Sequence, residues 1–356
     1  MTDFQYTRIA CAIRDRIAQN LYPNGRLPSE RELMVEFSVQ RDTVRRAFDV
    51  LESEGLVYRD ATRGRFATPS SGARAAQGTI LLAVRRTEFT TSTAAVQRGM
   101  APLVNDAGHG ISWLDLLGSA ETETLQLPAP DVLRARGVAG IALWPEMPAN
   151  LSRLKALRAA MPLVLLDRRI PGFESDFVGF DDAGASRTIT AHLIERGHRR
   201  IGFMSAEPLA ATVEARVRGW GTALEAAGIA PEPEWILHQD GGLGRISPER
   251  LMEYLNAGGD PLTAVVCAND TVAARLIYFL KSHGKRVPDD LVVTGFGNVQ
   301  PPLLDALGLT TMAQPFEEMG RAAAKMLLSR LRGKAGEPRD TELPMELVVR
   351  DSPPRK

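Results

Sequence analysis

The spacing of apolar residues changes near residue 70 of the chain. Before that point apolar residues recur at helical intervals, as in Ile9, Ile13 and Ile17, which share one face of a helix expected over residues 5–20. After residue 78, short continuous apolar runs alternate with amphipathic segments of helical period. The change predicts two domains of different architecture, and 356 residues are enough for both.

Two helices joined by a tight turn are expected next in the first region. Ser29 and Glu32 have the spacing of a capping box, in which the serine caps a helix and the glutamate reaches back. That helix should run to about Phe37. Only Ser38 and Val39 separate it from the following helical pattern, which is typical of a helix-turn-helix.

The third helix is expected from about residue 40 to residue 54, where Gly55 would end it. Its apolar positions form one stripe for burial: Val44, Ala47, Phe48 and Leu51. Two short strands, about 56–60 and 65–68, should follow it as a hairpin. Residues 1–69 are therefore predicted to form a winged helix-turn-helix, and the small, polar residues 70–78 a linker.

Residues 79–350 are predicted to form an α/β domain with two lobes. Continuous apolar runs suit strands buried on both faces, and hence parallel sheets covered by helices. Nine such runs in roughly 220 residues favour two linked lobes over one sheet. The runs are Thr79–Val84, Ile111–Leu117, Val138–Trp144, Leu163–Asp167, Phe177–Phe180, Ile201–Ser205, Trp235–Gln239, Ala264–Ala268 and Leu291–Phe296.

Charge is unevenly distributed, although the formal net charge of the chain is zero. Residues 1–77 contain 12 arginines, 10 acidic residues and no lysine. A guanidinium can bind a phosphate or a guanine edge through two hydrogen bonds, so this choice of cation favours DNA. Any single arginine can instead belong to a solvated helix face, because charged surface is common.

Side chains at the start of the third helix lie off the apolar stripe and are the expected DNA-reading residues. They are Gln40, Arg41, Thr43 and Arg45. The hairpin tip carries Arg63, Gly64 and Arg65, which would place two cationic side chains against phosphates or in the minor groove.

The motifs of this region resemble the GntR family of winged-helix DNA-binding domains. The resemblance spans roughly residues 4–68 and rests on Leu27–Leu33, Arg41–Ala47 and Leu51–Val57. It implies that Arg31, Arg41, Thr43, Arg45 and the Gly64 wing lie on DNA. Gln40 stands where the family usually has a capping serine, so it is a candidate for altered base preference.

Candidate ligand contacts follow the predicted strands of the second domain, since ligands of open α/β sheets bind at the carboxyl ends of strands. Asp167 and Asn269 occupy such ends, and Arg216 lies near the start of a helix that follows a strand. A carboxylate, an amide and a guanidinium supply the acceptors and donors that a polyhydroxyl ligand needs. Trp220 would add a flat wall for a sugar face, or alternatively belong to the core.

Several segments of the second domain resemble the LacI/GalR effector domain, which has a periplasmic-binding-protein-like fold. They are Val164–Arg168, His192–Phe203, Arg216–Trp220, Ala268–Asp270, Val287–Phe296 and Leu309–Ala323. A GntR-type head on this body is the layout of arabinose-repressor-type regulators. The resemblance implies a first lobe at about 79–168 and 298–328, and a second at about 169–297 and 329–350.

Asn298 marks a departure from that family. An acidic residue commonly follows the Gly-Phe pair of the late strand, whereas Gly297 and Asn298 stand here. Either Asn298 compensates, or the ligand is not a typical neutral sugar. Arg85 and Arg86, after the first strand, would favour an anionic ligand such as a sugar acid or phosphate.

Other chemistry has little support in the sequence. Cys11 and Cys267 are far apart and lack metal-ligand spacing, so neither a metal nor a cofactor is expected. Asp270 is predicted to be a helix N-cap. No apolar run approaches the ~20 residues of a membrane span, and the first residues lack a signal-peptide pattern, so we expect a cytoplasmic protein without a membrane partner.

These patterns predict a homodimeric regulator, most plausibly a repressor, that binds operator duplex DNA. A small carbohydrate-like effector between the lobes would change its affinity for DNA, with no catalytic step. A transport-type binding protein is the first alternative, disfavoured by the DNA-reading region. A nucleotide-dependent enzyme is the second, disfavoured because no Gly-x-Gly-x-x-Gly follows the first strand.

Overall fold

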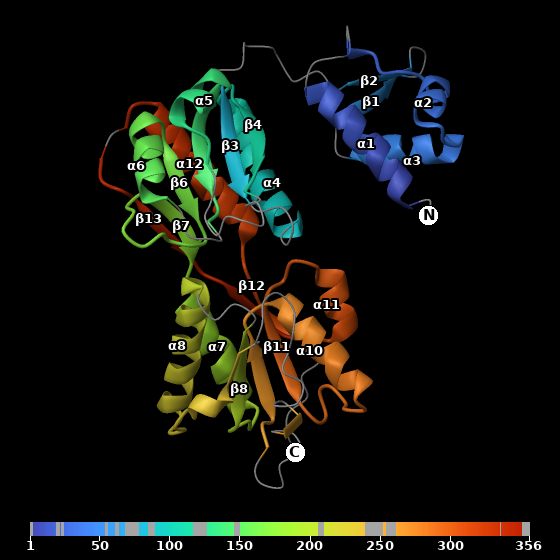
Figure 1. Cartoon of the computed structure of the whole chain (residues 1–356). Helices are drawn as coiled ribbons and strands as arrows, with labels where there is room; N and C mark the ends of the chain where they lie inside the picture. The colour runs from blue at the N-terminus through green and yellow to red at the C-terminus, as the bar shows by residue number, and fades with distance from the viewer. Residues whose placement is uncertain are drawn as a thin grey trace. The chain divides into compact units, whose positions relative to one another are not determined.

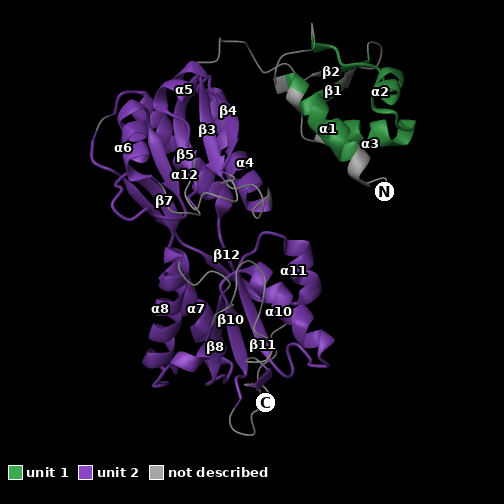
Figure 2. Ribbon diagram, in the orientation of Figure 1, with its two compact units in different colours: residues 1–75 green, residues 76–356 purple. Residues whose placement is uncertain are grey.

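Two compact units, residues 1–75 and 76–356, make up the computed structural model (Figure 2). The structure describes residues 3–18, 22, 25–53, 56–60, 64–67, 78–84, 90–116, 127–145, 150–205, 210–238, 252–253, 261–334 and 336–350. Several positions singled out in the sequence lie outside these ranges: Gly55, Arg63, Arg85, Arg86 and linker residues 70–77.

Unit 1 is a three-helix domain with a β-hairpin. Its elements are α1 (Asp3–Ala18), α2 (Glu30–Phe37), α3 (Arg41–Ser53), β1 (Val57–Asp60) and β2 (Gly64–Ala67). The two strands pair antiparallel, and the predicted apolar stripe of α3 is fully buried against α1 and α2. This order of elements confirms the predicted winged helix-turn-helix.

Local capping sets the angle between α2 and α3. The Ser29 hydroxyl accepts a hydrogen bond from the Glu32 backbone N–H at 3.3 Å, and the Glu32 carboxylate accepts one from the Ser29 N–H at 2.7 Å. Ser38 ends α2 in the left-handed conformation (φ 53°) and donates its N–H to the Met34 carbonyl. The chain therefore turns sharply, and α3 begins at Arg41.

The first lobe of unit 2 has a six-stranded parallel sheet in the order β13-β7-β6-β5-β3-β4 (Figure 1). Its strands are β3 (Thr79–Val84), β4 (Gly110–Asp115), β5 (Val138–Leu143), β6 (Leu163–Leu166), β7 (Asp176–Phe180) and β13 (Asp340–Leu343). Helices α4 (Thr90–Asp106) and α12 (Phe316–Leu331) cover one face, while α5 (Pro130–Ala135) and α6 (Leu151–Ala160) cover the other. Burial on both faces explains the continuous apolar runs.

The second lobe has a six-stranded sheet in the order β14-β12-β11-β10-β8-β9. Its strands are β8 (Ile201–Ser205), β9 (Ile236–His238), β10 (Ala264–Cys267), β11 (Val292–Gly297), β12 (Thr310–Ala313) and β14 (Glu346–Val348), the last antiparallel to β12. The helical elements are α7 (Asp182–Glu195), α8 (Ala211–Ala226), η2 (Pro233–Trp235), α10 (Asp270–Ser282) and α11 (Pro301–Leu307). All nine predicted strands are present as β3 to β11.

The chain crosses between the two sheets after β7, after β12, and between β13 and β14. The predicted lobe boundaries are therefore wrong in three segments. Strands β7 and β13, expected in the second lobe, belong to the first-lobe sheet, and β12, expected in the first lobe, belongs to the second. The apolar pattern marks a strand but does not indicate which sheet it joins.

Two helix pairs in unit 2 pack with their backbones in contact. A Cβ on Gly219 of α8 would lie 2.1 Å from the Ala183 carbonyl oxygen of α7, and one on Gly320 of α12 would lie 2.0 Å from the Val96 oxygen of α4. Glycine is therefore required at both crossings. The α7–α8 contact joins the first turn of α7, directly after the first crossing between the lobes, to the middle of α8.

Candidate DNA-reading surface and effector cleft

The start of α3 carries the exposed side chains expected to read DNA. Gln40 precedes the helix, and its carbonyl accepts the N–H groups of Thr43 and Val44 at 3.1 and 3.4 Å. Gln40, Arg41 and Arg45 are exposed, as is Arg31 on α2. Thr43 differs, because only 9% of the residue is exposed, so it offers little surface to a base or phosphate.

Glu30, at the start of α2, binds three of the arginines of this surface. Its carboxylate lies 2.7 Å from Arg41 Nε, 3.4 Å from Arg45 Nε and 3.0 Å from Arg65 Nη1. Hydrogen bonding from Arg41 is the main cause that lowers the pKa of Glu30 to about 2, so the carboxylate is charged at any physiological pH. The capping pattern in the sequence points to its neighbours Ser29 and Glu32 and does not predict these contacts of Glu30.

The Arg65 side chain stabilises the hairpin through contacts within the domain, and it is not free to bind DNA at the tip. It lies in β2, donates Nε to Glu52 at 2.7 Å, and places its guanidinium 4.3 Å from the centre of the Phe48 ring. Its side chain is only 14% exposed. Gly64, with φ 102°, remains at the exposed end of the hairpin, where only glycine adopts this conformation readily.

Asp167 follows β6 at the carboxyl end of the first-lobe sheet. Its backbone is left-handed (φ 63°), a conformation that costs free energy for a residue other than glycine. Oδ2 accepts the indole N–H of Trp144 at 3.2 Å and lies 3.7 Å from Arg168 Nε. Oδ1 is buried and finds no hydrogen-bond partner among the described residues.

Arg216, on α8 of the second lobe, forms a buried ion pair with Asp182, the first residue of α7. Its Nε and Nη2 lie 2.8 and 2.7 Å from Asp182 Oδ1, and Nη1 donates to the Ala268 carbonyl. Burial raises the pKa of Asp182 to about 6, with Arg216 opposing the rise and the Asp167 charge adding to it. Asp167, Asp182 and Arg216 thus interact electrostatically. Asp167 and Arg216 are predicted site residues, whereas Asp182 is not.

Two cavities lie where the lobes meet. One, of about 280 Å³, is lined by Asp167, Phe180, Asp182, Thr212 and Arg218, among others. The second, of about 310 Å³, lies between α4 and the loop after β11 and includes Asn298. Asn298 is therefore placed apart from Asp167, and its side-chain oxygen already accepts from Arg350 at 3.0 Å.

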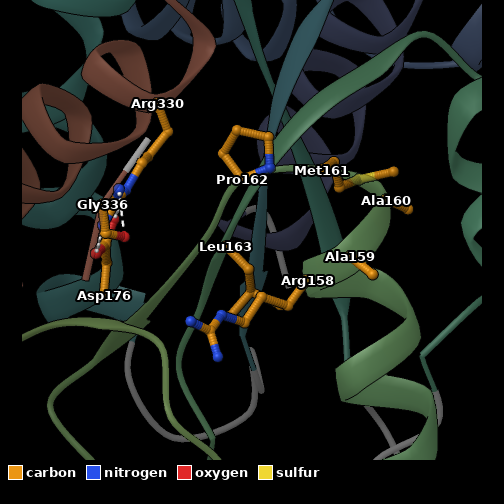
Figure 3. A pocket seen from close by; sticks show the side chains of 9 residues that line it. All are labelled: Arg158, Ala159, Ala160, Met161, Pro162, Leu163, Asp176, Arg330 and Gly336. Atoms are coloured by element: carbon orange, nitrogen blue, oxygen red, sulfur yellow. Dashed lines mark hydrogen bonds and ion pairs between the residues drawn. The ribbon is translucent and has the colours of Figure 1, made fainter. Parts of the chain in front are cut away.

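A third cavity, of about 410 Å³, lies at the opposite end of the first-lobe sheet, at the amino ends of β6 and β7 (Figure 3). Among the described residues that line it, Asp176 is the one carboxylate, and its oxygens bind Arg330 at 2.7 and 2.9 Å and the Arg339 N–H at 2.9 Å. Both oxygens of Asp176 have partners within the protein, whereas Oδ1 of Asp167 has none among the described residues. The chemistry therefore favours the smaller cavity between the lobes as a ligand site.

Two sequence expectations for the second lobe need correction. The N-cap of α10 is Asn269, whose side-chain oxygen accepts from Val272 N at 2.9 Å, whereas Asp270 was expected there. Asp270 instead holds the loop after β11 through Asn298 N and the Thr311 hydroxyl, both at 2.6 Å. Trp220 is 2% exposed and donates its indole N–H to the Ile201 carbonyl, so we do not retain it as a ligand contact.

The raised pKa of Asp182 predicts a pH dependence of stability. The folded protein binds this proton more tightly than the unfolded chain, so the resulting stabilisation is present near pH 4 and lost as the pH rises through about 6. In Asp182→Asn that contribution should vanish. Urea unfolding at several pH values between 4 and 7 measures it, and an unchanged slope in the variant would contradict the assignment.

A winged helix-turn-helix followed by a two-lobed parallel-sheet domain defines a class of transcription regulators. Residues 5–66 match the bacterial regulatory proteins of the gntR family, and residues 190–353 match a periplasmic binding protein-like domain. The chain is thus a DNA-binding transcription regulator with a gntR-family domain in unit 1 and a periplasmic binding protein-like domain in unit 2. No helix among the described residues is long and apolar enough to span a bilayer.

Curated proteins and solved structures are similar to the whole chain or to a large part of it. An arabinose metabolism transcriptional repressor of Halalkalibacterium halodurans is 28% identical over 336 residues, which are 91% of this chain and 88% of that one. The repressor PurR of Photobacterium profundum is 30% identical over 212 residues, 60% of this chain and 63% of its own. A LacI family regulator of Enterococcus faecium, solved with ribose, shares the fold with a TM-score of 0.65 at 23% identity, over 78% of this chain and all of that one.

Proposed function

We propose that the chain is a cytoplasmic, homodimeric repressor whose affinity for operator DNA is set by a small polyhydroxyl effector bound between the lobes of unit 2. Two copies of the exposed α3 surface would bind a roughly palindromic site, as two-fold symmetry requires. Effector binding would close the lobes about their three crossings, and ligand and DNA affinities would be coupled reciprocally. Binding alone accounts for this function, without catalysis.

Asp167 is the observation on which the effector site rests. A buried carboxylate oxygen without a partner is costly, and a ligand hydroxyl in the cavity between the lobes would supply the missing hydrogen bond. Trp144 fixes the other oxygen and so fixes the direction of the first. Asp182 lines the same cavity, and its buried partner Arg216 holds this second carboxylate in place.

The relatives support a carbohydrate-like effector. One is named for arabinose metabolism, and solved structures that resemble the body of this chain contain ribose or cellobiose.

A ligand screen by thermal shift on the full chain tests this proposal, with sugars, sugar acids, sugar phosphates and nucleosides as the compounds. A ligand at 100 times its dissociation constant stabilises by about 2.7 kcal/mol, which is visible as a higher melting temperature. The hit should then change the retention of DNA in a gel-shift assay. An acid that binds better than its neutral parent would support the anionic effector that the sequence suggested, and equal binding would argue against it.

Asp167→Asn should weaken binding of the effector found in that screen by about 10- to 100-fold, the usual weight of a hydrogen bond to a charged group. Asp181→Asn is the matched control, because Asp181 lines the same cavity but caps α7 by accepting from Gly184 N at 2.8 Å, a role that asparagine also fills. Calorimetric titration measures both. Wild-type affinity in Asp167→Asn, or an equal loss in the control, would refute the assigned contact.

A further inference from the structure

Glu30 makes more contacts with arginine than helix capping requires. An acidic residue in the first turn of a helix is favourable in itself, because it faces the positive end of the helix dipole. Here, however, Ser29 and Glu32 already complete the capping box. The Glu30 carboxylate is free for another task, and it binds guanidinium groups from both α3 and the hairpin.

Glu30 contacts two arginines through Nε, which leaves their terminal Nη groups available for DNA. Arg41 and Arg45 both approach Glu30 Oε2 through Nε, at 2.7 and 3.4 Å. Their Nη groups have no hydrogen-bond partner in the parts of the chain that the structure describes, and the side chains are 62% and 51% exposed. A guanidinium held at Nε keeps both Nη groups for the O6 and N7 atoms of guanine, or for a phosphate.

The second carboxylate oxygen of Glu30 connects the helix-turn-helix to the wing. Oε1 accepts Arg65 Nη1 at 3.0 Å, while Arg65 Nε binds Glu52 on α3. Because Arg65 is half-buried and packs on Phe48, this contact anchors Glu30 itself. One carboxylate, 17% exposed, thus has one oxygen fixed to the hairpin and the other directed at the two exposed arginines.

We propose that Glu30 is a positioning residue for DNA recognition, which orients Arg41 and Arg45 and competes with phosphates for them. The inference rests on the proposed function, since it takes duplex DNA as the partner. Arginines that are already oriented lose less freedom when they meet the correct bases. Non-specific binding needs only positive charge near phosphates, and a carboxylate among the arginines opposes it. Glu30 therefore increases the ratio of specific to non-specific affinity.

The experiment compares two DNA duplexes with the full-length protein. The first is selected from a randomised duplex pool by the wild-type chain, and the second is a scrambled version of the same composition. Fluorescence anisotropy at several salt concentrations gives both affinities. We expect Glu30→Gln to lower the ratio between them at least about tenfold, with the scrambled duplex bound as tightly as before or more tightly.

Glu36→Gln is the matched control. It removes the same charge from the same helix, but Glu36 pairs with Arg16 of α1 and not with the arginines of α3. The control should keep the wild-type ratio. An unchanged ratio in Glu30→Gln, or an equal loss in Glu36→Gln, would overturn the proposal. A wild-type chain that enriches no duplex would instead refute the DNA-binding function itself.

A double-mutant cycle separates orientation from folding. Arg41→Lys keeps the charge but loses the planar guanidinium, so the ratio should fall while scrambled DNA is bound normally. In the Arg41→Lys background, Glu30→Gln should have a much smaller effect than in the wild type. Strict additivity would mean that Glu30 acts only through stability, and this too would overturn the proposal. If Glu30→Gln fails to fold, Arg41→Lys and Arg45→Lys still test the oriented side chains.

Discussion

Arg216→Met should lower the free energy of unfolding of the effector unit by about 3–5 kcal/mol near neutral pH, the usual cost of removing one partner of a buried ion pair. The reason is that Asp182 would remain buried without its cation, since Arg216 supplies both Nε and Nη2 to the same carboxylate oxygen. Burial would then raise the pKa of Asp182 above about 6, so the loss should shrink as the pH falls towards 6, where the variant is already protonated, and stay constant below it.

Urea unfolding monitored by tryptophan fluorescence measures this loss. The double variant Arg216→Met/Asp182→Leu is its control, because replacing both members of a buried pair by apolar residues is often neutral. We expect the double variant to recover most of the stability that the single variant loses. A loss below about 1 kcal/mol in the single variant would show that Asp182 is hydrated or neutral.

Gly219→Ala should destabilise the second lobe by about 1–3 kcal/mol, the usual cost of overpacking, although alanine is the better helix former. The new methyl group would clash with the backbone oxygen of Ala183. The clash could be relieved only if α7 and α8 moved apart and lost their close contact. Because Asp182 is the first residue of α7, the shift should also weaken the Arg216 ion pair.

Gly221→Ala, two residues along the same helix, provides the matched comparison. Nothing lies within 4 Å of a Cβ at Gly221, so alanine should stabilise the protein there by up to about 1 kcal/mol. The two substitutions are chemically identical and differ only in the space around them. Thermal unfolding that shifted both variants in the same direction would disprove the close crossing.

The sequence was most informative where local physics decides the structure. The capping box at Ser29 and the stripe on α3 depend on neighbours three or four residues apart, and both are present as expected. The central apolar runs became strands because they are buried on both faces of a sheet, whereas the edge strand β4 is only partly buried. Strands β12, β13 and β14 were missed: β12 is a four-residue strand that includes two threonines, and β13 and β14 are short edge strands with exposed charged residues such as Glu342 and Glu346.

The candidate site was predictable only in part, for a similar reason. The rule of strand ends located Asp167, and a family motif located Arg216, and the structure connects them through Asp182. Asp182 also follows a strand end, at β7, and the same rule applied there would have found it. Whether Trp220 is buried depends on which face of α8 packs against the sheet, which the sequence motif does not indicate. The contacts of Glu30 require α2, α3 and β2 to come together in the folded domain.

The path of the backbone also bears on how a gene of this kind can be cut and joined. Unit 1 is an uninterrupted stretch, so one recombination breakpoint is enough to attach or exchange it. The lobes offer no such breakpoint, because each contains segments from both sides of the other. A stop codon directly after Arg339 would remove an edge strand from both sheets at once. New heads can be spliced onto this body, whereas its two lobes must be inherited together.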